Sequence, residues 1–139
     1  MDAIMNAIEK LEAGQEGYLP GFFGFEWIRA EAGLVEGRLR LERRHLAPNG
    51  YLHAAAVVAL ADSACGFGCQ LSLPAAATGF TTVELKTNFI GTARDGSVTC
   101  RAKLAHAGKT TQVWDASVKS EPAGKTIALF RCTQILLYS

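Results

Sequence analysis

One nearly uncharged stretch constrains this chain more than any other feature. Residues 49–68 read NGYLHAAAVVALADSACGFG, and Asp62 is the only charged side chain among them. The apolar residues continue long enough for a helix, and Pro74 follows shortly after, so we predict a helix from residue 53 to about residue 71. Small side chains on every face let neighbouring backbone approach closely, so this helix should be enclosed on several sides. A carboxylate in such a place needs a partner or a function.

Length and charge narrow the class of protein. The chain has 139 residues, of which 49% are hydrophobic, and its net charge is +1. These values predict a single globular domain over residues 1–139. No basic block is present, so we expect neither nucleic acid nor an anionic membrane as a partner. Asp62 interrupts the apolar run before a membrane-spanning length, and the N-terminus has no signal-peptide pattern, so we expect a cytoplasmic location.

Periodicity predicts a short helix and six strands around the central helix. The helix is expected over residues 2–12, where apolar residues have helical spacing at Ile4, Met5, Ile8 and Leu11. Strands are expected over residues 21–33, 34–44, 79–90, 96–107, 109–120 and 125–138. Short connections favour antiparallel neighbours. The order α-β-β-α-β-β-β-β therefore predicts an α+β fold in which one antiparallel sheet curls around the central helix.

The four cysteines are expected to be buried free thiols. Cys65, Cys69, Cys100 and Cys132 all occur in apolar patterns, and no C-x-x-C pair is present. Cys65 and Cys69 are one helical turn apart, which alone is a weak zinc half-site, and the usual ligand spacings are missing. We expect no metal site.

Three motifs occur in order along the chain. They are Gly50-Tyr51-Leu52-His53-Ala54-Ala55 with Leu60-Ala61-Asp62, then TTVELKTNFIGTARDG at residues 81–96, then HAGKTT at residues 106–111. The first resembles the Gly-x-x-His-Gly-Gly and Leu-Ala-Asp hallmark of hotdog-fold acyl-CoA thioesterases, specifically the phenylacetic-acid-degradation (PaaI-like) subgroup. The second resembles that family's Thr-x-Glu-Leu-x-x-x-Phe strand with its Gly-closed turn, and the third its His-x-Gly-Arg turn. The resemblance covers residue 20 to the C-terminus and implies the hotdog fold.

Two departures from the family pattern concern the same loop. Both glycines after the histidine are replaced, by Ala54 and Ala55. The asparagine that many relatives carry six residues before the histidine is Ala47 here, although Asn49 lies nearby. A backbone N–H does not depend on its side chain, so the first change is compatible with activity if these residues have helical φ. The second puts the role of that asparagine in doubt.

The resemblance implies hydrolysis of an acyl-CoA to a free acid and coenzyme A, with no cofactor beyond the CoA of the substrate. It assigns polarisation of the carbonyl to the backbone N–H of Ala55, at the start of the helix, where N–H groups are free and the dipole favours an oxyanion. Asp62 is then the general base on water or the nucleophile. The alternative for Asp62 is a buried structural acid bonded to loop N–H groups.

Other candidate residues have less defined roles. His53 is a helix cap, a structural hydrogen-bonding group or a direct catalyst, and Asn49 is a candidate because it lies near the missing asparagine. Thr82 resembles the hydroxyl that relatives use to hold the acid or its water, but it shares strand parity with Glu84, so a surface role stays open unless a bulge or Thr81 substitutes. The candidates for binding the substrate, any of which could equally be solvated turn residues, are Gly50, Tyr51, Ala54, Arg94, Lys109, Thr110 and Thr111.

Helix geometry predicts that the site is shared between two chains. Ala55 and Asp62 are seven residues apart, which is about 10 Å of rise. A base must approach its proton to about 3 Å or act through one water, so one chain cannot both polarise the carbonyl and attack it. We therefore predict a dimer, or a dimer of dimers, with two shared sites per dimer. Two alternatives remain: a non-catalytic acyl-CoA-binding hotdog protein, and an enoyl-thioester hydratase or dehydratase, whose loop pattern is not found here.

Overall fold

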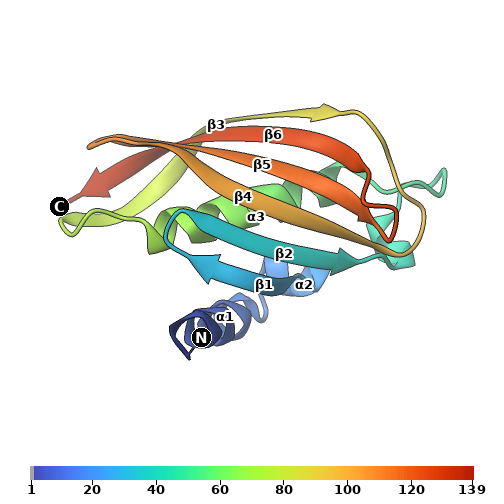
Figure 1. Cartoon of the computed structure of the whole chain (residues 1–139), viewed down its shortest axis with the longest axis horizontal. Coiled ribbons are helices and arrows are strands. Elements are labelled where there is room, and N and C mark those ends of the chain that lie inside the picture. Colours follow the sequence, from blue (N-terminus) through green and yellow to red (C-terminus); the bar gives the residue numbers. More distant parts are fainter. Residues whose placement is uncertain (1) are drawn as a thin grey trace.

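A six-stranded antiparallel sheet curls around one long helix in the computed structural model, which describes residues 2–139 apart from the side chain of Ile4 (Figure 1). The elements are α1 (Asp2–Gln15), α2 (Leu19–Phe23), β1 (Glu26–Glu31), β2 (Leu34–Arg40), the 3-10 turn η1 (Arg43–His45), α3 (Ala54–Leu71), β3 (Ala77–Phe89), β4 (Ser97–Ala107), β5 (Thr111–Glu121) and β6 (Thr126–Tyr138). The strand order is β1-β2-β4-β5-β6-β3, so β1 and β3 are the edges. The predicted α+β class and the central helix are confirmed.

The central helix α3 is buried because its small residues let the sheet approach its backbone. At Gly68, a Cβ would lie 2.4 Å from the ring of Trp114, so only glycine allows this contact. Trp114 is fully buried and is a core residue. By length and composition α3 could also cross a membrane, contrary to the expectation that Asp62 keeps the run too short. Its packing against the sheet accounts for the apolar composition.

The N-terminal third differs from prediction in two places. The strand expected over residues 21–33 begins only at Glu26, because Pro20 starts the short helix α2 and Gly24, with φ 82°, ends it. The strand expected over residues 34–44 ends at Arg40, and the chain then forms η1. The helix α1 extends to Gln15; Ile8 is buried, whereas Met5 is exposed.

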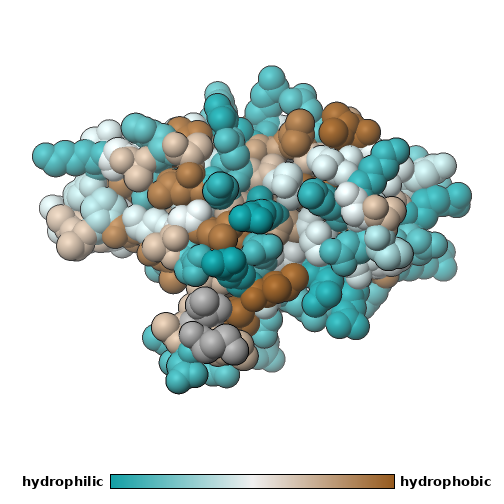
Figure 2. Space-filling model, viewed as in Figure 1, coloured by the Kyte–Doolittle hydropathy of each residue, from teal (hydrophilic) through white to brown (hydrophobic). Residues whose placement is uncertain are grey.

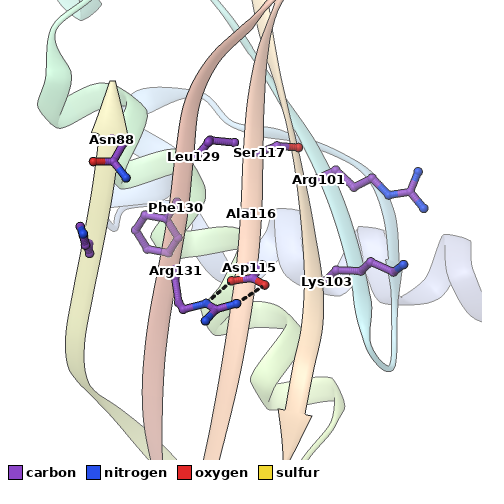
Figure 3. Close-up of a pocket in the computed structure, with 10 residues that line it drawn as sticks. Asn88, Arg101, Lys103, Asp115, Ala116, Ser117, Leu129, Phe130 and Arg131 are labelled. Carbon is purple, nitrogen blue, oxygen red and sulfur yellow. Dashed lines mark hydrogen bonds and ion pairs between the residues drawn. The ribbon is translucent and has the colours of Figure 1, made fainter. Parts of the chain in front are cut away.

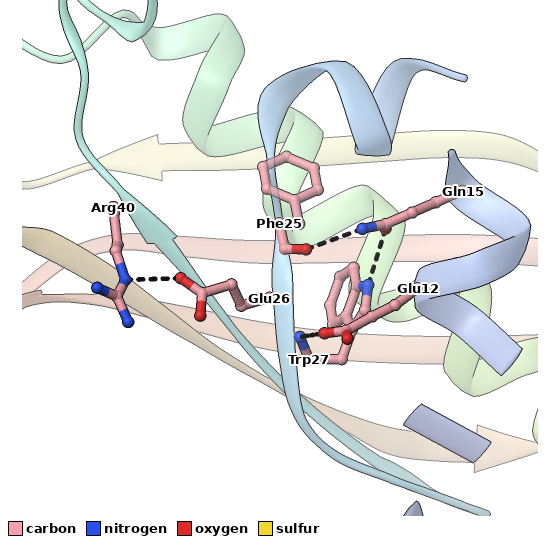
Figure 4. A network of polar contacts seen from close by, with 6 residues as sticks. All are labelled: Glu12, Gln15, Phe25, Glu26, Trp27 and Arg40. Atoms are coloured by element: carbon pink, nitrogen blue, oxygen red, sulfur yellow. Dashed lines mark hydrogen bonds and ion pairs between the residues drawn. The ribbon is translucent and has the colours of Figure 1, made fainter. Parts of the chain in front are cut away.

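Helix α1 covers the β1 edge of the sheet (Figure 4). The backbone N–H of Trp27 donates to Glu12 Oε2 at 3.1 Å, and Gln15 Nε2 donates to the carbonyl oxygen of Phe25 at 2.8 Å. The indole N–H of Trp27 also donates to Gln15 Oε1 at 2.9 Å. Edge groups that would otherwise pair with another strand therefore have partners within the chain.

The β3 edge has no such cover among the described residues. This strand is 13 residues long; its burial pattern shows nine exposed residues, four partly buried residues and no fully buried residue. Large apolar side chains on or next to it reach solvent, at 52% for Val83, 41% for Leu85, 47% for Phe89 and 57% for Ile90. Apolar surface is visible along the upper margin of Figure 2, where Figure 1 draws β3. A long edge strand with exposed apolar side chains can pair with a strand of another chain.

All four cysteines are buried free thiols, as predicted. Burial raises the pKa of Cys69 to about 11 and that of Cys100 to about 12, so neither is a nucleophile near neutral pH. Among the described residues, no group of three His, Cys, Asp or Glu side chains is placed to hold a metal ion.

Candidate active site

A tight loop precedes α3 and fixes where the helix begins. The N–H of Ala47 donates to the carbonyl oxygen of Tyr51 at 2.7 Å, and Gly50 occupies the left-handed region at φ +88°. The side-chain oxygen of Asn49 accepts from the N–H of Tyr51 at 3.1 Å, so Asn49 orders this loop. The guanidinium of Arg94 lies 4.9 Å from the ring centroid of Tyr51. Three predicted substrate-binding residues, Gly50, Tyr51 and Arg94, therefore lie together.

His53 caps the helix, which confirms one of its three predicted roles. Its backbone is extended, at φ −69° and ψ 134°, and its Nδ1 accepts from the N–H of Ala55 at 2.9 Å. Because Nδ1 is the acceptor, a neutral His53 ring carries its hydrogen on Nε2. The N–H of Ala55 is thus engaged in this conformation. Among the hydrogen bonds of the described residues, the N–H of Ala54 has no partner.

The start of α3 is a suitable place for a developing negative charge. Ala54 and Ala55 are both exposed, and the first turn of this 18-residue helix contains no acidic residue. The free N–H of Ala54 and the helix dipole favour an anion there. The helix start can therefore polarise a carbonyl group that reaches it.

Asp62 lies half-buried in the middle of α3 and lacks a partner. Its Oδ1 atom is buried and makes no hydrogen bond with any described residue. Burial raises the pKa of the Asp62 carboxyl above its usual value of 3.8. A structural acid held by loop N–H groups would have a lowered pKa. An unpaired oxygen and a raised pKa are compatible with a general base or a nucleophile.

A bulge in β3 gives Thr82 a different orientation from its neighbours. The pairing of β3 with β6 shifts between Thr82 and Glu84, so the two side chains lie on opposite faces of the sheet. Thr82 pairs with the buried Gln134 and donates to its Oε1 at 2.7 Å. Thr82 therefore faces α3, although within one chain its recorded bond is to Gln134 and not to Asp62.

The turn that contains Lys109, Thr110 and Thr111 lies far from the helix start. It follows β4, whereas Arg94 precedes the same 11-residue strand; such a strand is about 36 Å long at about 3.3 Å per residue. The turn is next to the other end of α3, because Gln112 donates to the carbonyl oxygen of Ser72 at 2.9 Å. Within one chain, Lys109 and Arg94 do not form one site.

Two cavities flank the start of α3. One lies on the β3 side and measures about 220 Å³; its lining includes Ala54, Val57 and Thr92. The other measures about 200 Å³ and lies toward α2, where Phe23, Arg44 and His53 contribute to its lining. Phe23 and Arg44 were not predicted as site residues, because both fell within predicted strands. Pro20 and Gly24, which bracket a helical turn, were an available signal for Phe23.

A larger groove on the opposite face of the sheet has no catalytic arrangement (Figure 3). It measures about 430 Å³, and its one acid, Asp115, makes two hydrogen bonds with Arg131, at 2.5 and 2.8 Å. Hydrogen bonding to Arg131 lowers the pKa of the Asp115 carboxyl. A carboxylate stabilised in this way is a poor base, so the start of α3 and Asp62 remain the candidate site.

Comparison with known proteins identifies the family. A family model described as the thioesterase superfamily matches residues 49–127, which include α3 and the strands β3, β4 and β5. The chain belongs to the thioesterase superfamily. It is also 32% identical over 110 residues to a 1,4-dihydroxy-2-naphthoyl-CoA hydrolase of Listeria monocytogenes, covering 79% of this chain and 88% of that protein. The resemblance to hotdog thioesterases is thereby confirmed, and the protein is a thioester hydrolase.

Solved structures agree with this thioesterase fold. A mutant of the thioesterase PA1618 from Pseudomonas aeruginosa has a TM-score of 0.89 at 26% identity, covering 95% of this chain and 94% of that one. The PaaI protein of Escherichia coli, from the phenylacetic acid degradation operon, has a TM-score of 0.83 at 21% identity, covering 96% and 94%. The second likeness concerns the fold alone.

Proposed function

We propose that this thioesterase hydrolyses acyl-CoA thioesters to a free acid and coenzyme A, with active sites shared between two chains and no cofactor. The Listeria relative is named as a hydrolase of an aryl-CoA, which supports CoA as the carrier of the acyl group. The observation on which the proposal depends most is Asp62, a half-buried acid whose Oδ1 has no partner among the described residues.

The carbonyl oxygen of the substrate is proposed to bind at the start of α3. The Ala54 N–H is free to donate, and the Ala55 N–H becomes a second donor if His53 turns away. With Nδ1 accepting from Ala55, the Nε2 hydrogen of His53 is a further donor toward the substrate. These groups stabilise the oxyanion that forms when the carbonyl carbon is attacked.

The attacking group is proposed to come from the partner's Asp62. Seven residues separate Ala55 from Asp62, and the resulting ~10 Å of helix rise exceeds the reach of a carboxylate to its substrate. As a base, Asp62 takes a proton from water, whose oxygen bonds to the carbonyl carbon. As a nucleophile, it forms an anhydride that water then hydrolyses. In both cases the C–S bond breaks, and the departing CoA thiolate takes up a proton.

The exposed β3 edge supports the dimer that this chemistry needs. Two copies pairing along β3 would cover Val83, Leu85 and Phe89 and continue the sheet. A twofold axis at this edge makes the two α3 helices antiparallel, so each Asp62 approaches the other helix start. The same symmetry brings the partner's Lys109 turn toward Arg94, where both could bind CoA phosphates. A dimer of dimers is compatible with this arrangement.

The discriminating experiment measures release of CoA and binding of the substrate in the same variants. Asp62→Asn should abolish CoA release from benzoyl-CoA and hexanoyl-CoA while titration calorimetry still detects binding. Ser63→Ala, at the adjacent half-buried position, is the control and should retain turnover. If the wild-type chain binds these thioesters and releases no CoA, the protein is instead a non-catalytic acyl-CoA-binding protein. The alanines at 47, 54 and 55 are the residues that favour this alternative.

A further inference from the structure

A buried glutamine on β6, Gln134, contacts the hydroxyl group of Thr82, which faces α3. We propose that Gln134 is a positioning residue for thioester hydrolysis: it orients this hydroxyl so that Thr82 and Asp62 of one chain hold the reacting water between them. The inference rests on the proposed function, because it takes Asp62 to be the attacking group.

Two contacts show how α3 and β3 run past each other. Toward the end of the helix, a Cβ at Gly66 would lie 3.6 Å from the ring of Phe80. Toward its start, Val57 lines one cavity together with Phe89. The two elements are therefore antiparallel, and residues 57–66 of α3 lie opposite residues 80–89 of β3 in reverse order.

Asp62 and Thr82 lie at the same level on these facing surfaces. Asp62 precedes Gly66 by four residues, so both lie on the face of the helix that approaches Phe80. Thr82 follows Phe80 by two residues with no register shift between them, so their side chains share one face of the sheet. The two intervals are about 6 Å along the helix and about 7 Å along the strand. The carboxyl group and the hydroxyl group therefore point into the same space.

The side-chain amide of Gln134 engages the hydrogen of the Thr82 hydroxyl. Gln134 is fully buried, and its Nε2 donates to Cys132 Sγ at 3.5 Å. This contact leaves Oε1 to accept from Thr82 Oγ1 at 2.7 Å. A hydroxyl has one hydrogen and two lone pairs, so Thr82 can only accept a hydrogen bond from any further group.

A water molecule satisfies both Thr82 and Asp62. An ionised carboxylate also only accepts hydrogen bonds, so Asp62 cannot bond directly to a hydroxyl whose hydrogen is engaged. Water can donate one hydrogen to Thr82 Oγ1 and the other to Asp62 Oδ1, which has no partner among the described residues. Thr82 is exposed, so water reaches it in the single chain. The lone pairs of this water remain free to attack a carbonyl carbon.

The hydrolysis balances with these groups alone. The water oxygen bonds to the carbonyl carbon at the start of the other chain's α3, and one water proton passes to Asp62. The C–S bond then breaks, and this proton passes to the CoA thiolate. If Asp62 is instead the nucleophile, the water held by Thr82 hydrolyses the anhydride. Without Gln134, the Thr82 hydrogen is free to bond to Asp62, which occupies the carboxylate and displaces the water.

The test is a double-mutant cycle on kcat for CoA release from benzoyl-CoA and hexanoyl-CoA. Gln134→Leu and Thr82→Val should each lower kcat about 10-fold, the upper end for one neutral hydrogen bond, with KM nearly unchanged. Because Gln134 acts through the Thr82 hydroxyl, the double variant should be no slower than Thr82→Val alone. Thr82→Ser keeps the hydroxyl and should retain most of kcat.

Gln112→Leu is the matched control. Gln112 is also a buried glutamine, and it lies opposite Gln134 on β5. Its side chain bonds with Trp114 and with the carbonyl oxygen of Ser72. Gln112→Leu should lower the unfolding temperature, and any effect on kcat should be the same in the wild-type and Thr82→Val backgrounds. Circular dichroism checks every variant, and Gln134→Met, which also lacks the acceptor, replaces Gln134→Leu if the latter does not fold.

The outcomes separate this inference from the proposed function. No CoA release by the wild-type protein, or full turnover by Asp62→Asn, would contradict the proposed function. If the wild-type protein is active and Asp62→Asn is not, three results would overturn the role of Gln134 and leave thioester hydrolysis standing. These are full kcat in the Gln134 variant, full kcat in Thr82→Val, and a double variant in which the two losses multiply.

Discussion

A mixed dimer of two inactive variants tests whether each active site draws on two chains. Asp62→Asn removes the attacking group, and Ala54→Pro removes the free N–H at the helix start. Proline is well tolerated at the first helical position, and His53, at ψ 134°, already has the extended backbone that a residue before proline prefers. Ala54→Ser, which retains the N–H, is the matched control for the proline variant.

The expected activities follow from counting intact sites. Each homodimer has two defective sites, and its kcat should fall ~10²–10⁴-fold, as for loss of a general base or an oxyanion donor. In the mixed dimer, one site combines the intact helix start of one chain with the intact Asp62 of the other. The second site has both defects. A mixed dimer should therefore show about half the wild-type activity.

The assay is CoA release by mixed dimers that carry two different affinity tags and are purified on both. Circular dichroism checks that each variant has the wild-type helix content and unfolds at a similar temperature. If the mixed dimer is as inactive as the two homodimers, Asp62 acts on its own chain, and the ~10 Å separation along α3 has been misjudged.

Three further predictions concern stability and assembly. Asp62→Asn should raise the free energy of unfolding at neutral pH. Burial raises the pKa of this carboxyl above 3.8, so the folded chain holds the proton more tightly than the unfolded chain. Ionisation of Asp62 therefore lowers the stability of the wild-type protein as pH rises through the folded pKa. Denaturant titrations should therefore show the largest gain near pH 7 and none well below pH 3.8, and a gain that grows toward low pH would contradict the assignment. Gly68→Ala should lower the free energy of unfolding by about 1–3 kcal/mol, because its Cβ would lie 2.4 Å from the Trp114 ring. Gly66→Ala is the control and should be neutral or stabilising, because its Cβ would lie 3.6 Å from the nearest ring atom. Leu85→Lys should give monomers in analytical ultracentrifugation together with loss of CoA release, and an active monomer would refute the shared site.

Local sequence patterns were sufficient for the elements that form the site. The small-residue run predicted α3 because its periodicity and its flanking breakers agree. The interval from His53 to Asp62, taken from the family resemblance, identified two candidate residues on this element, and their catalytic roles stay predictions. Alternation of apolar and polar residues predicted the long strands. In β4, the alternating residues Val98, Cys100 and Ala102 do lie on the buried face. In these segments the local preference and the tertiary fold agree.

The errors arose where one residue outweighs the pattern around it. Residues 21–23 were predicted as the start of a strand, but they belong to the short helix α2, which contains Pro20 and ends at Gly24. For Thr82, the sequence left a surface role open because of its parity with Glu84, and the bulge between them places Thr82 on the face of α3. Arg44 was not recognised as a candidate because its proximity to the helix start depends on η1, which no periodicity signals. Each case depends on tertiary contacts or backbone conformation that period counting does not capture.

The proposed dimer and the proposed catalysis involve the same part of the chain, because the β3 edge and the buried Asp62 Oδ1 both lack partners among the described residues. Helix α1 supplies hydrogen-bond partners to the β1 edge, while the β3 edge has none among the described residues. Three buried polar atoms of the described residues lack partners: Asp62 Oδ1 on α3, Thr87 Oγ1 on β3 and Arg38 Nε on β2. Thr87 pairs with the buried Phe130, so its side chain faces α3. A second copy along β3 would cover the apolar edge and bring polar groups to Asp62 Oδ1 and Thr87 Oγ1, so loss of the dimer should remove activity without requiring loss of the fold.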